Sequence, residues 1–304
     1  MRNDGLEGEA ARISRSEAQV FPMPIRIVQS KQNARLKELR RALSRPGRET
    51  KGLAGVEGMH LLEEALRADM KVPSVFVAQE SQESIEQFVE HLGLSEQIEV
   101  LVVPRAILDS VLETETPQPV AALVEMPDWT WGHVLRARGA WAPMVVVLAG
   151  LQDPGNLGTI LRSAEAFGAT GVVALPGTVS AWNPKAVRSS AGSIFRVPLL
   201  AVTAEECFTC LREAGARILT TTVRGAEPAD MMNFTGPVAL LIGNEGNGVP
   251  EELARQADAR ITIPCPGAVE SLNAAVATSV LLYEACRQRM ATAGGSNSLR
   301  GSAR

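Results

Sequence analysis

The spacing of apolar and polar residues predicts that the chain begins with a small unit of alternating helices and strands. A basic helix is predicted over 31–43, and a second helix over 59–68. Strands are predicted over 52–57, 74–78, 99–103 and 117–124. These elements span roughly 100 residues, which is enough for one domain of α/β character.

The second half of the chain has a sharper pattern of apolar runs. Buried strands are predicted at 144–149, 172–175, 198–202, 217–222, 238–242 and 260–263. Helices are predicted at 157–167 and 207–214, from 249 onward, and at 274–290. Apolar strands that alternate with helices are typical of a parallel sheet covered on both faces. The predicted fold class is therefore α/β, with a small N-terminal domain and a larger parallel-sheet C-terminal domain.

Three segments lack a regular pattern and set the predicted domain boundaries. Residues 1–22 are polar and the tail 291–304 is rich in Gly and Ser, so both are predicted to be disordered. Residues 126–142 hold three of the four tryptophans and are predicted to be a linker, with the tryptophans covering the domain junction. The N-terminal domain is then predicted over 23–125 and the C-terminal domain over 143–290.

Composition narrows the class of protein. A hydrophobic fraction of 45% and a charged fraction of 21% are ordinary for a globular protein. No apolar run reaches the roughly 18 to 20 residues needed to cross a bilayer, and the first residues lack an apolar signal core. We therefore expect a cytoplasmic protein. Cys207 and Cys210 form a lone CxxC without a second pair, and the three histidines are scattered, so no metal site is predicted.

The charge distribution matters more than the net charge of −4. Between 31 and 51 the chain has a large excess of basic residues: Lys31, Arg35, Lys37, Arg40, Arg41, Arg45, Arg48 and Lys51. Such a patch can bind a phosphate backbone by releasing its counterions, and Lys31, Arg35, Arg40, Arg41 and Arg45 are the candidate RNA-binding residues. The alternative is a solvated helix face, because Leu36, Leu39 and Leu43 supply an apolar stripe.

Three glycine-rich loops follow apolar strands in the second half, at 150–158, 243–248 and 264–273. Ligands of open parallel sheets bind at the carboxyl ends of the strands, where loops and helix N-termini present backbone N–H groups. None of the loops has the GxGxxG spacing of dinucleotide-binding proteins or the GxxxxGK[ST] spacing of P-loop proteins. The alternative is that these glycines only make tight turns.

The polar residues of these loops favour chemistry over simple turns. Asn156 and Arg162 belong to the first loop and the helix after it, and a lone arginine in that place suits a phosphate. The second loop holds Glu245, and the third holds Ser271 and Asn273 just before the last helix. The alternative role of Ser271 is a helix cap.

The same three segments resemble a known family. They read DPGNLGTILRSAEAFGATGVV, LLIGNEGNGVP and ITIPCPGAVESLNAAVATSVLLYEACRQ. These segments resemble, in order and spacing, the three signature motifs of the SpoU (TrmH-like) RNA 2′-O-ribose methyltransferases of the SPOUT superfamily. The segments IVQSKQNARLKEL and VEGMHLLEEAL are similar to the RNA substrate-binding domain of many members, whose fold is like that of a small ribosomal protein. The resemblance covers residues 25–290.

The resemblance implies methylation of a ribose 2′-hydroxyl in structured RNA with S-adenosylmethionine as the cofactor. It favours 23S ribosomal RNA, because the best-known transfer-RNA enzymes of the family lack the extra domain. It also implies a deep trefoil knot in the C-terminal domain, an exception to the rule that chains do not thread loops, and a homodimer formed through that domain. No metal is implied, because the sulfonium of the cofactor already activates the methyl group.

Site residues follow from the resemblance by motif match. The candidates for binding the cofactor are Thr222, Gly243, Ile263 and Leu272. The candidates for catalysis are Asn156, Arg162, Glu245, Ser271 and Asn273. We expect Arg162 to stabilise charge on the 2′-oxygen or hold a phosphate, with Glu245 and Asn156 orienting Arg162 and the loops. Ser271 and Asn273 are expected to fix the ribose and the cofactor.

The sequence leaves several alternatives open. Arg162 could act as a base rather than as an electrostatic stabiliser, and it could serve its own subunit or the neighbouring one. The RNA could be transfer RNA. The chain could also be a non-catalytic RNA-binding factor for ribosome assembly, or an oxidoreductase on a nucleotide-binding sheet. The missing GxGxxG argues against the last of these.

Overall fold

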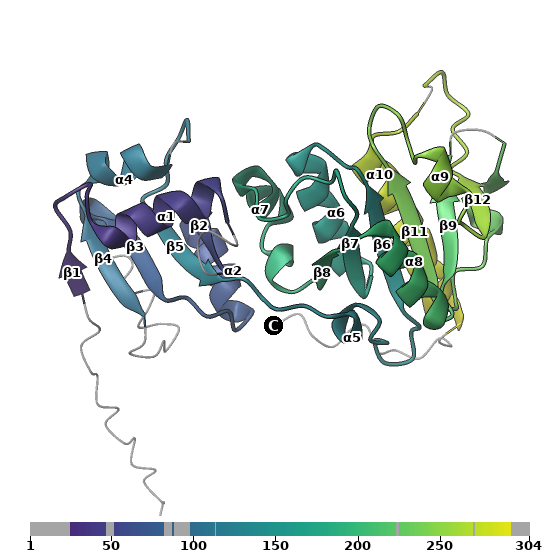
Figure 1. Ribbon diagram of the computed structural model, residues 1–304, viewed down its shortest axis with the longest axis horizontal. Helices are drawn as coiled ribbons and strands as arrows, with labels where there is room; N and C mark the ends of the chain where they lie inside the picture. Colours follow the sequence, from purple (N-terminus) through teal and green to yellow (C-terminus); the bar gives the residue numbers. More distant parts are fainter. Residues whose placement is uncertain are drawn as a thin grey trace, which may run out of the picture.

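The computed structural model describes residues 25–46, 52–81, 87, 98–112, 114–222, 225–269 and 271–292, and shows two α/β domains side by side (Figure 1). Segment 1–22, predicted to be disordered, lies outside the described residues. So do residues 293–304 of the tail predicted over 291–304, and part of the basic segment, including Arg48 and Lys51. The predicted tail starts two residues too early, because the last helix continues to Thr292. No helix of the described ranges is long and apolar enough to span a membrane.

The N-terminal domain is built on a mixed sheet with the strand order β1-β4-β3-β5-β2. Its strands are β1 (Ile25–Ile27), β2 (Leu53–Glu57), β3 (Ser74–Ala78), β4 (Glu99–Val103) and β5 (Val120–Glu125). Strands β1, β4 and β3 are parallel, and β5 is antiparallel to both of its neighbours. A short turn of 3-10 helix, η2 (Gln79–Ser81), follows β3.

Helices cover both faces of this sheet in the described part of the domain. Helices α1 (Ala34–Ser44) and α4 (Arg105–Leu112) pack on one face, and α2 (Met59–Arg67) packs on the other. Helix α1 begins at its cap Asn33, whose Oδ1 accepts hydrogen bonds from the backbone N–H groups of Arg35 (2.9 Å) and Leu36 (3.4 Å). The leucine stripe of α1 is buried, so its basic residues line the outer side of the domain.

The C-terminal domain is built on a sheet whose seven described strands are all parallel, in the order β10-β12-β9-β11-β6-β7-β8. The strands are β6 (Met144–Ala149), β7 (Gly171–Ala174), β8 (Leu199–Ala201), β9 (Arg217–Thr221), β10 (Glu227–Pro228), β11 (Val238–Gly243) and β12 (Ala259–Thr262). The predicted α/β class with a parallel sheet is therefore confirmed.

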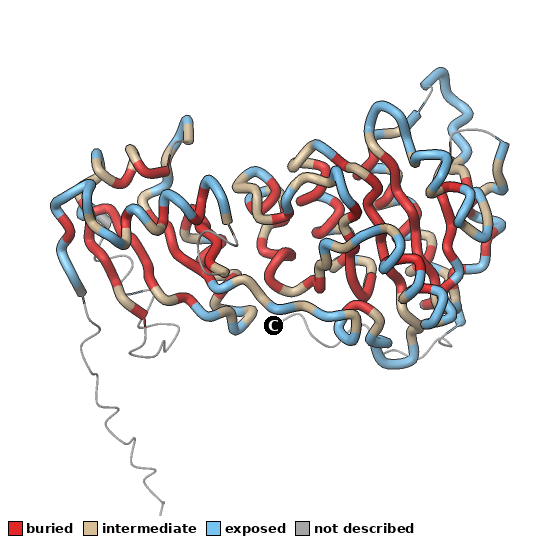
Figure 2. Tube along the Cα trace, viewed as in Figure 1, coloured by how far each residue is buried: buried red, intermediate tan, exposed pale blue. Residues whose placement is uncertain are grey.

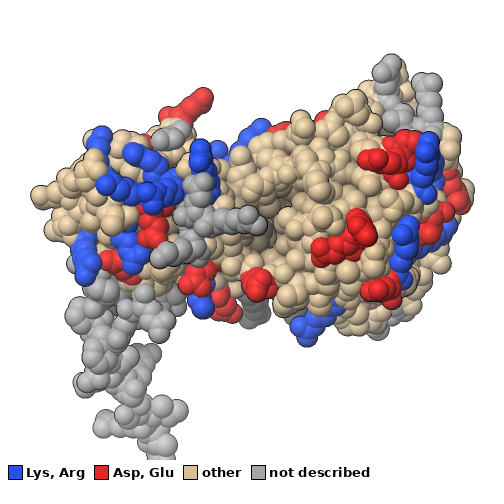
Figure 3. Space-filling model, viewed as in Figure 1, with Lys and Arg blue, Asp and Glu red and all other residues tan. Residues whose placement is uncertain are grey.

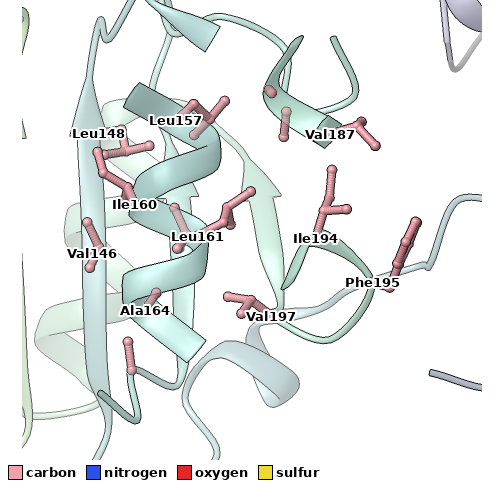
Figure 4. Close-up of a cluster of buried hydrophobic side chains, with 14 of the residues drawn as sticks. Val146, Leu148, Leu157, Ile160, Leu161, Ala164, Val187, Ile194, Phe195 and Val197 are labelled. Carbon is pink, nitrogen blue, oxygen red and sulfur yellow. The ribbon is translucent and has the colours of Figure 1, made fainter. Parts of the chain in front are cut away.

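Helices cover both faces of this sheet, which leaves the central strands buried (Figure 2). One face carries α6 (Pro154–Ala166) and α10 (Ala274–Thr292), and α7 (Pro184–Ser190) packs on α6. The other carries α5 (Trp131–Val134), α8 (Ala204–Glu213) and α9 (Glu251–Ala254). Short 3-10 turns occur at η3 (Ser193–Phe195) and η4 (Ala229–Met231). Figure 4 shows the apolar side of α6 packed between β6 and the segment that contains Val187, Ile194 and Val197.

The two domains meet where α7 packs against β2, the edge strand of the N-terminal sheet. Arg196 strengthens this junction, since its guanidinium pairs with Glu64 on α2 (2.8 Å) and with Glu165 on α6. Two of the three tryptophans of segment 126–142, which were predicted to cover the junction, pack elsewhere. Trp131 donates a hydrogen bond to Glu206 on α8 (2.9 Å), and Trp141 lies against Gly168, so both pack on the C-terminal domain.

A buried arginine near the end of α10 ties together the starts of two central strands. The Arg289 side chain donates hydrogen bonds to the backbone carbonyls of Ala142, Pro143, Phe234 and Gly236, at distances of 2.6 to 3.4 Å. The residue is 1% exposed, and burial lowers the pKa of its guanidinium. Because these carbonyls precede β6 and β11, Arg289 fixes the end of the sheet opposite to the glycine-rich loops.

We expect Arg289→Met to lower the free energy of unfolding by about 3–5 kcal/mol, because the buried carbonyls lose their donors. Urea denaturation of the full chain measures this change. The matched control is Arg287→Met on the same helix, where the arginine is exposed and pairs with Glu284. That variant should stay within about 0.5 kcal/mol of wild type. Equal effects of the two substitutions would contradict the structural role of Arg289.

Candidate active site

The three glycine-rich loops gather at one edge of the C-terminal sheet. They follow β6, β11 and β12, and these strands, together with β9, form a contiguous parallel set in the sheet. The carboxyl ends of parallel strands point to the same edge, so the loops become neighbours although they are far apart in the sequence. In Figure 1 this edge lies at the top of the C-terminal domain, where α6 and α10 begin.

Three of the predicted catalytic residues form a continuous hydrogen-bonded chain, one from each loop. Asn156 Nδ2 donates to Glu245 Oε1 (2.9 Å), and Asn273 Nδ2 donates to Asn156 Oδ1 (3.0 Å). Asn156 is buried in the first turn of α6, between the other two. The side-chain amide of Asn156 therefore uses both its donor and its acceptor to join the second loop to the third.

Glu245 also holds the loop that follows β6. Its carboxylate accepts hydrogen bonds from the backbone N–H groups of Asp153 (3.1 Å) and Gln152 (3.3 Å). Partial burial raises the pKa of the Glu245 carboxyl, but the hydrogen bonds from Asn156 and from these backbone groups outweigh it, and the pKa is lowered. Glu245 is therefore ionised at neutral pH, and its carboxylate holds the backbone of the first loop.

Asn273 also caps the N-terminus of α10. Its Oδ1 accepts hydrogen bonds from the backbone N–H groups of Ala275 (2.9 Å) and Val276 (3.2 Å). The capping role that the sequence offered for Ser271 therefore belongs to Asn273, and that alternative is wrong. Ser271 is exposed in the same loop, two residues before the cap.

Arg162 stands apart from this network within one chain. It lies six residues after Asn156 on α6, which places the two side chains about 120° apart around the helix. Arg162 is exposed, and among the described residues its guanidinium has no hydrogen-bond or ion-pair partner. The predicted orientation of Arg162 by Glu245 and Asn156 is thus not made by direct contact in a single chain.

The candidate cofactor residues lie at the same edge. Thr222, Gly243 and Ile263 follow or end β9, β11 and β12, and Leu272 directly precedes Asn273. Ile263 and Leu272 are half-buried. Apolar side chains beside the backbone groups of strand ends are what an adenosyl group requires, so the residues present fit the expected cofactor.

The fold of the chain itself also requires a glycine at position 243. A Cβ there would lie 2.0 Å from the carbonyl carbon of Gly248, because the loop folds back on the strand end. The fold-back is held by two backbone hydrogen bonds between Asn244 and Gly248, of 3.0 and 2.9 Å. The tight-turn interpretation therefore holds for this glycine, and it is compatible with a cofactor contact through the backbone.

Two family models match the chain. The SpoU rRNA Methylase family matches residues 143–283, and the MRM3-like substrate binding domain matches residues 33–122. A curated relative, the 23S rRNA (guanosine(2553)-2′-O)-methyltransferase RlmP of Bacillus subtilis (strain 168), is 32% identical over 258 residues, which cover 84% of this chain and 97% of the relative. The chain belongs to the SpoU methylase family.

Solved structures of other family members agree with this assignment. An AdoMet-bound rRNA methyltransferase from Sinorhizobium meliloti has a TM-score of 0.75 and 30% identity, and the match covers 87% of this chain and 98% of that one. The SpoU methyltransferase AviRb from Streptomyces viridochromogenes, in complex with AdoMet, has a TM-score of 0.74 and 29% identity, with coverages of 85% and 99%. The predicted family, enzyme class and cofactor are therefore confirmed.

The sequence did not identify two contacts that shape the first loop of this SpoU methylase. Asp153 caps α6 by accepting from the backbone N–H of Gly155 (2.9 Å), and it pairs with Lys185 on α7 (2.9 Å). The hydrogen bond from Lys185 lowers the pKa of the Asp153 carboxyl. An aspartate directly before a helix-starting proline is a recognisable cap signal, whereas Lys185 had no local signal.

The basic surface of the N-terminal domain lies on α1 and its flanks, where Figure 3 shows lysines and arginines gathered. Lys31, Arg40, Arg41 and Arg45 are exposed. Arg35 differs, because its guanidinium pairs with Glu38 (2.9 Å) and Glu99 (3.0 Å). The hydrogen bond to Glu38, against the effect of burial, raises the pKa of Arg35. Two carboxylates neutralise this arginine, so it is a weaker candidate for RNA than Lys31 and Arg41.

Proposed function

We propose that this SpoU methylase transfers the methyl group of S-adenosylmethionine to a ribose 2′-hydroxyl of 23S ribosomal RNA. The observation that carries this proposal is the Asn156–Glu245–Asn273 chain, which joins all three family motifs at the cofactor edge of the sheet. The relative RlmP, whose name specifies a 23S rRNA guanosine, supports the choice of RNA. The protein is then expected to act in the cytoplasm.

The roles of the residues follow from their positions. S-adenosylmethionine supplies an electrophilic methyl group when it is bound. Thr222, Gly243, Ile263 and Leu272 would hold it through backbone groups and apolar contact. The Asn156–Glu245–Asn273 chain would keep the three loops in a fixed geometry, so that little reorganisation is needed when the ribose arrives. Ser271, exposed beside that chain, would bind the ribose.

Arg162 would act on the 2′-oxygen. As the O2′–methyl bond forms and the bond between that methyl group and the sulfur of the cofactor breaks, S-adenosylhomocysteine would leave. The hydroxyl proton would pass to solvent or to an RNA phosphate, and negative charge would develop on the oxygen. A guanidinium stabilises that charge well, whereas it holds its own protons too tightly to act as a base at neutral pH. The exposed position of Arg162, with no carboxylate beside it in the described part of the chain, supports the electrostatic role.

We further propose a homodimer formed through the C-terminal domain. Helix α10 exposes Val276 (49%), Val280 (41%) and Tyr283 (56%), whose spacing of four and three residues places them on one stripe. A hydrogen bond between Ser163 and Ser279 (2.7 Å) places α6 directly beside this helix. A second copy seated on the stripe would come close to Arg162, so each arginine could serve the neighbouring cofactor.

Family membership also supports two finer assignments. We propose that the segment from β11 to α10 forms the deep trefoil knot of the SPOUT superfamily around the cofactor. We also propose that residues 23–125 are the RNA substrate-binding domain, 126–142 the linker and 143–290 the methyltransferase domain. The match of residues 33–122 to a substrate binding domain supports this division.

The basic surface on α1 is expected to bind the RNA backbone. The double variant Lys31→Ala/Arg41→Ala should weaken RNA binding and lower the slope of log K against log salt by about 1.5 to 2, because two phosphate contacts are lost. Fluorescence anisotropy at several salt concentrations measures the slope. The control is Lys71→Ala/Arg217→Ala, which removes two exposed cations away from α1. An unchanged slope in the first variant would mean that the patch is only a solvated face.

The proposed function is tested by transfer of radiolabelled methyl groups to separated RNAs. We expect the label in 23S ribosomal RNA, resistant to alkali at one nucleotide because its ribose lacks a free 2′-hydroxyl. Label in transfer RNA alone would replace the proposed substrate. RNA binding without any transfer at high protein concentration would indicate an assembly factor on the same fold. Mapping of ribose methylation in cells with and without the gene identifies the nucleotide.

A further inference from the structure

A cavity of about 460 Å³ lies at the junction of the two domains, and none of the proposed catalytic or cofactor-binding residues lines it. Its walls come from the end of β2, from the segment after α4 and from α7. The lining residues are Glu57, Thr114, Glu115, Thr116, Gln118 and Arg188. The cavity is therefore shared between the substrate-binding domain and the methyltransferase domain.

Glu57, which lines this cavity, has one carboxylate oxygen that is buried without a hydrogen-bond partner. The side chain of Glu57 is 4% exposed, and its Oε1 accepts hydrogen bonds from Thr114 Oγ1 and from the backbone N–H of Gln118, both at 2.9 Å. Its Oε2 has no hydrogen-bond partner among the described residues, and Arg188 Nη1 lies 4.0 Å away, beyond hydrogen-bonding distance. A buried acceptor of this kind is costly unless a donor reaches it.

The cavity lies between the basic surface and the active site. The segment that contains Thr114 follows α4, and the carbonyl of Ser110 on α4 accepts a hydrogen bond from Arg40 (3.0 Å). On the other side, α7 carries Arg188 and packs closely on α6, whose first turn holds Asn156. RNA that extends from α1 to the methyl-transfer site would therefore pass this cavity.

The lining selects a ligand that donates hydrogen bonds. The cavity is lined by two carboxylates, those of Glu57 and Glu115, and by one guanidinium, that of Arg188. Their net negative charge would repel a phosphate inside the cavity. A carboxylate oxygen suits the amino group of an unpaired base, as in the recognition of the cytosine amino group by acidic side chains. The hydroxyls of Thr114 and Thr116 and the Gln118 amide can bond to the remaining polar edge of a base.

We propose that this cavity receives an unpaired, amino-bearing nucleobase of the RNA substrate, whose amino group donates a hydrogen bond to Glu57 Oε2. The inference rests on the proposed function, because it supposes an RNA substrate. Arg188 also lines the cavity and its side chain is 46% exposed, so it can turn outward to the phosphate of the bound nucleotide and open the buried Glu57 Oε2 to the base. The cavity thus recognises the base of a nucleotide other than the one whose ribose is methylated.

Two fluorescent RNA hairpins test the proposal with the full chain. They share one stem, and their seven-nucleotide loops are all cytidine or all uridine, so the loop base presents an amino group in one and a carbonyl in the other. We expect the wild type to bind the cytidine hairpin about tenfold more tightly. Glu57→Gln should abolish this preference, because the amide can donate to the uracil carbonyl. Glu115→Gln, which removes the same charge from an exposed position in the same cavity, should retain it.

Other outcomes overturn the inference. Equal binding of both hairpins by the wild type, or an unchanged preference in Glu57→Gln, would show that no base is read here. Glu57→Gln and Arg188→Ala could each weaken the binding of both hairpins to the same extent. That result would show that the two residues hold the domains together and do not recognise a base. If Glu57→Gln fails to fold, adenosine and inosine loops test the wild type alone, because they differ by the same exchange of amino group for carbonyl. Methyl transfer to 23S RNA, measured on the same preparations, separates failure of this inference from failure of the proposed function.

Discussion

Arg162→Ala is expected to lower methyl transfer by about two to three orders of magnitude, with binding of S-adenosylmethionine unchanged. The loss is that of one positioned donor at a developing oxyanion, which typically costs 10²–10³ in turnover. Because Arg162 is exposed and makes no hydrogen bond or ion pair to the described residues, the variant should fold as stably as the wild type. Single-turnover transfer and calorimetric titration with the cofactor measure the two quantities separately.

Two control variants test whether turnover depends on an arginine at position 162 or only on the number of positive charges. Arg217→Ala removes an exposed arginine at the start of β9, at the opposite edge of the sheet, and should retain wild-type turnover. Arg162→Lys keeps the charge but loses the planar fork, so its turnover should be intermediate. Wild-type turnover in Arg162→Ala would remove Arg162 from the mechanism.

The central strands could be predicted closely from the sequence, because a strand buried on both faces is a continuous apolar run. The observed bounds of β3, β4 and β6 equal the predicted ranges. Helix α7 could not be predicted, because its sequence PKAVRSS carries no clear periodicity. It forms because Asn183 caps it and because Gly158 lets it approach α6, where a Cβ would lie only 2.4 Å from the Ala186 carbonyl oxygen. The Asn183 cap is a local signal, but the close approach to α6 is a tertiary reason that a local pattern does not show.

For the active site, the sequence indicated which residues come together but not how they bond. The motifs placed Asn156, Glu245 and Asn273 at one sheet edge, and the structure joins them across separations of 89 and 117 residues. The capping role of Asn273 and the isolation of Arg162 depend on side-chain direction, which spacing alone does not determine. The Glu57 oxygen without a hydrogen-bond partner among the described residues could not be predicted from the sequence either, because it lies where the two domains meet.

Glu245→Gln is expected to weaken both cofactor binding and methyl transfer by about tenfold to a hundredfold. The carboxylate accepts three hydrogen bonds, from Asn156 and from the backbone N–H groups of Gln152 and Asp153. A glutamine keeps only one acceptor oxygen, so its amide group must face at least one of these donors, which costs about 1–3 kcal/mol. The control is Gln152→Ala, which keeps the backbone N–H that Glu245 uses.

The pH dependence of cofactor binding gives a second, independent test of the role of the Glu245 charge. Its carboxyl pKa is lowered in the folded protein, so the carboxylate contributes its full stabilisation above the ordinary glutamate pKa and loses it only as the pH falls through the folded value. Wild-type affinity should therefore be constant from neutral pH to about pH 5 and decline only below about pH 4. Glu245→Gln should bind weakly throughout, without that decline, because the amide does not titrate. A decline of equal size in the variant would assign the acid sensitivity to another group, and wild-type affinity in the variant would show that the three loops do not depend on this charge.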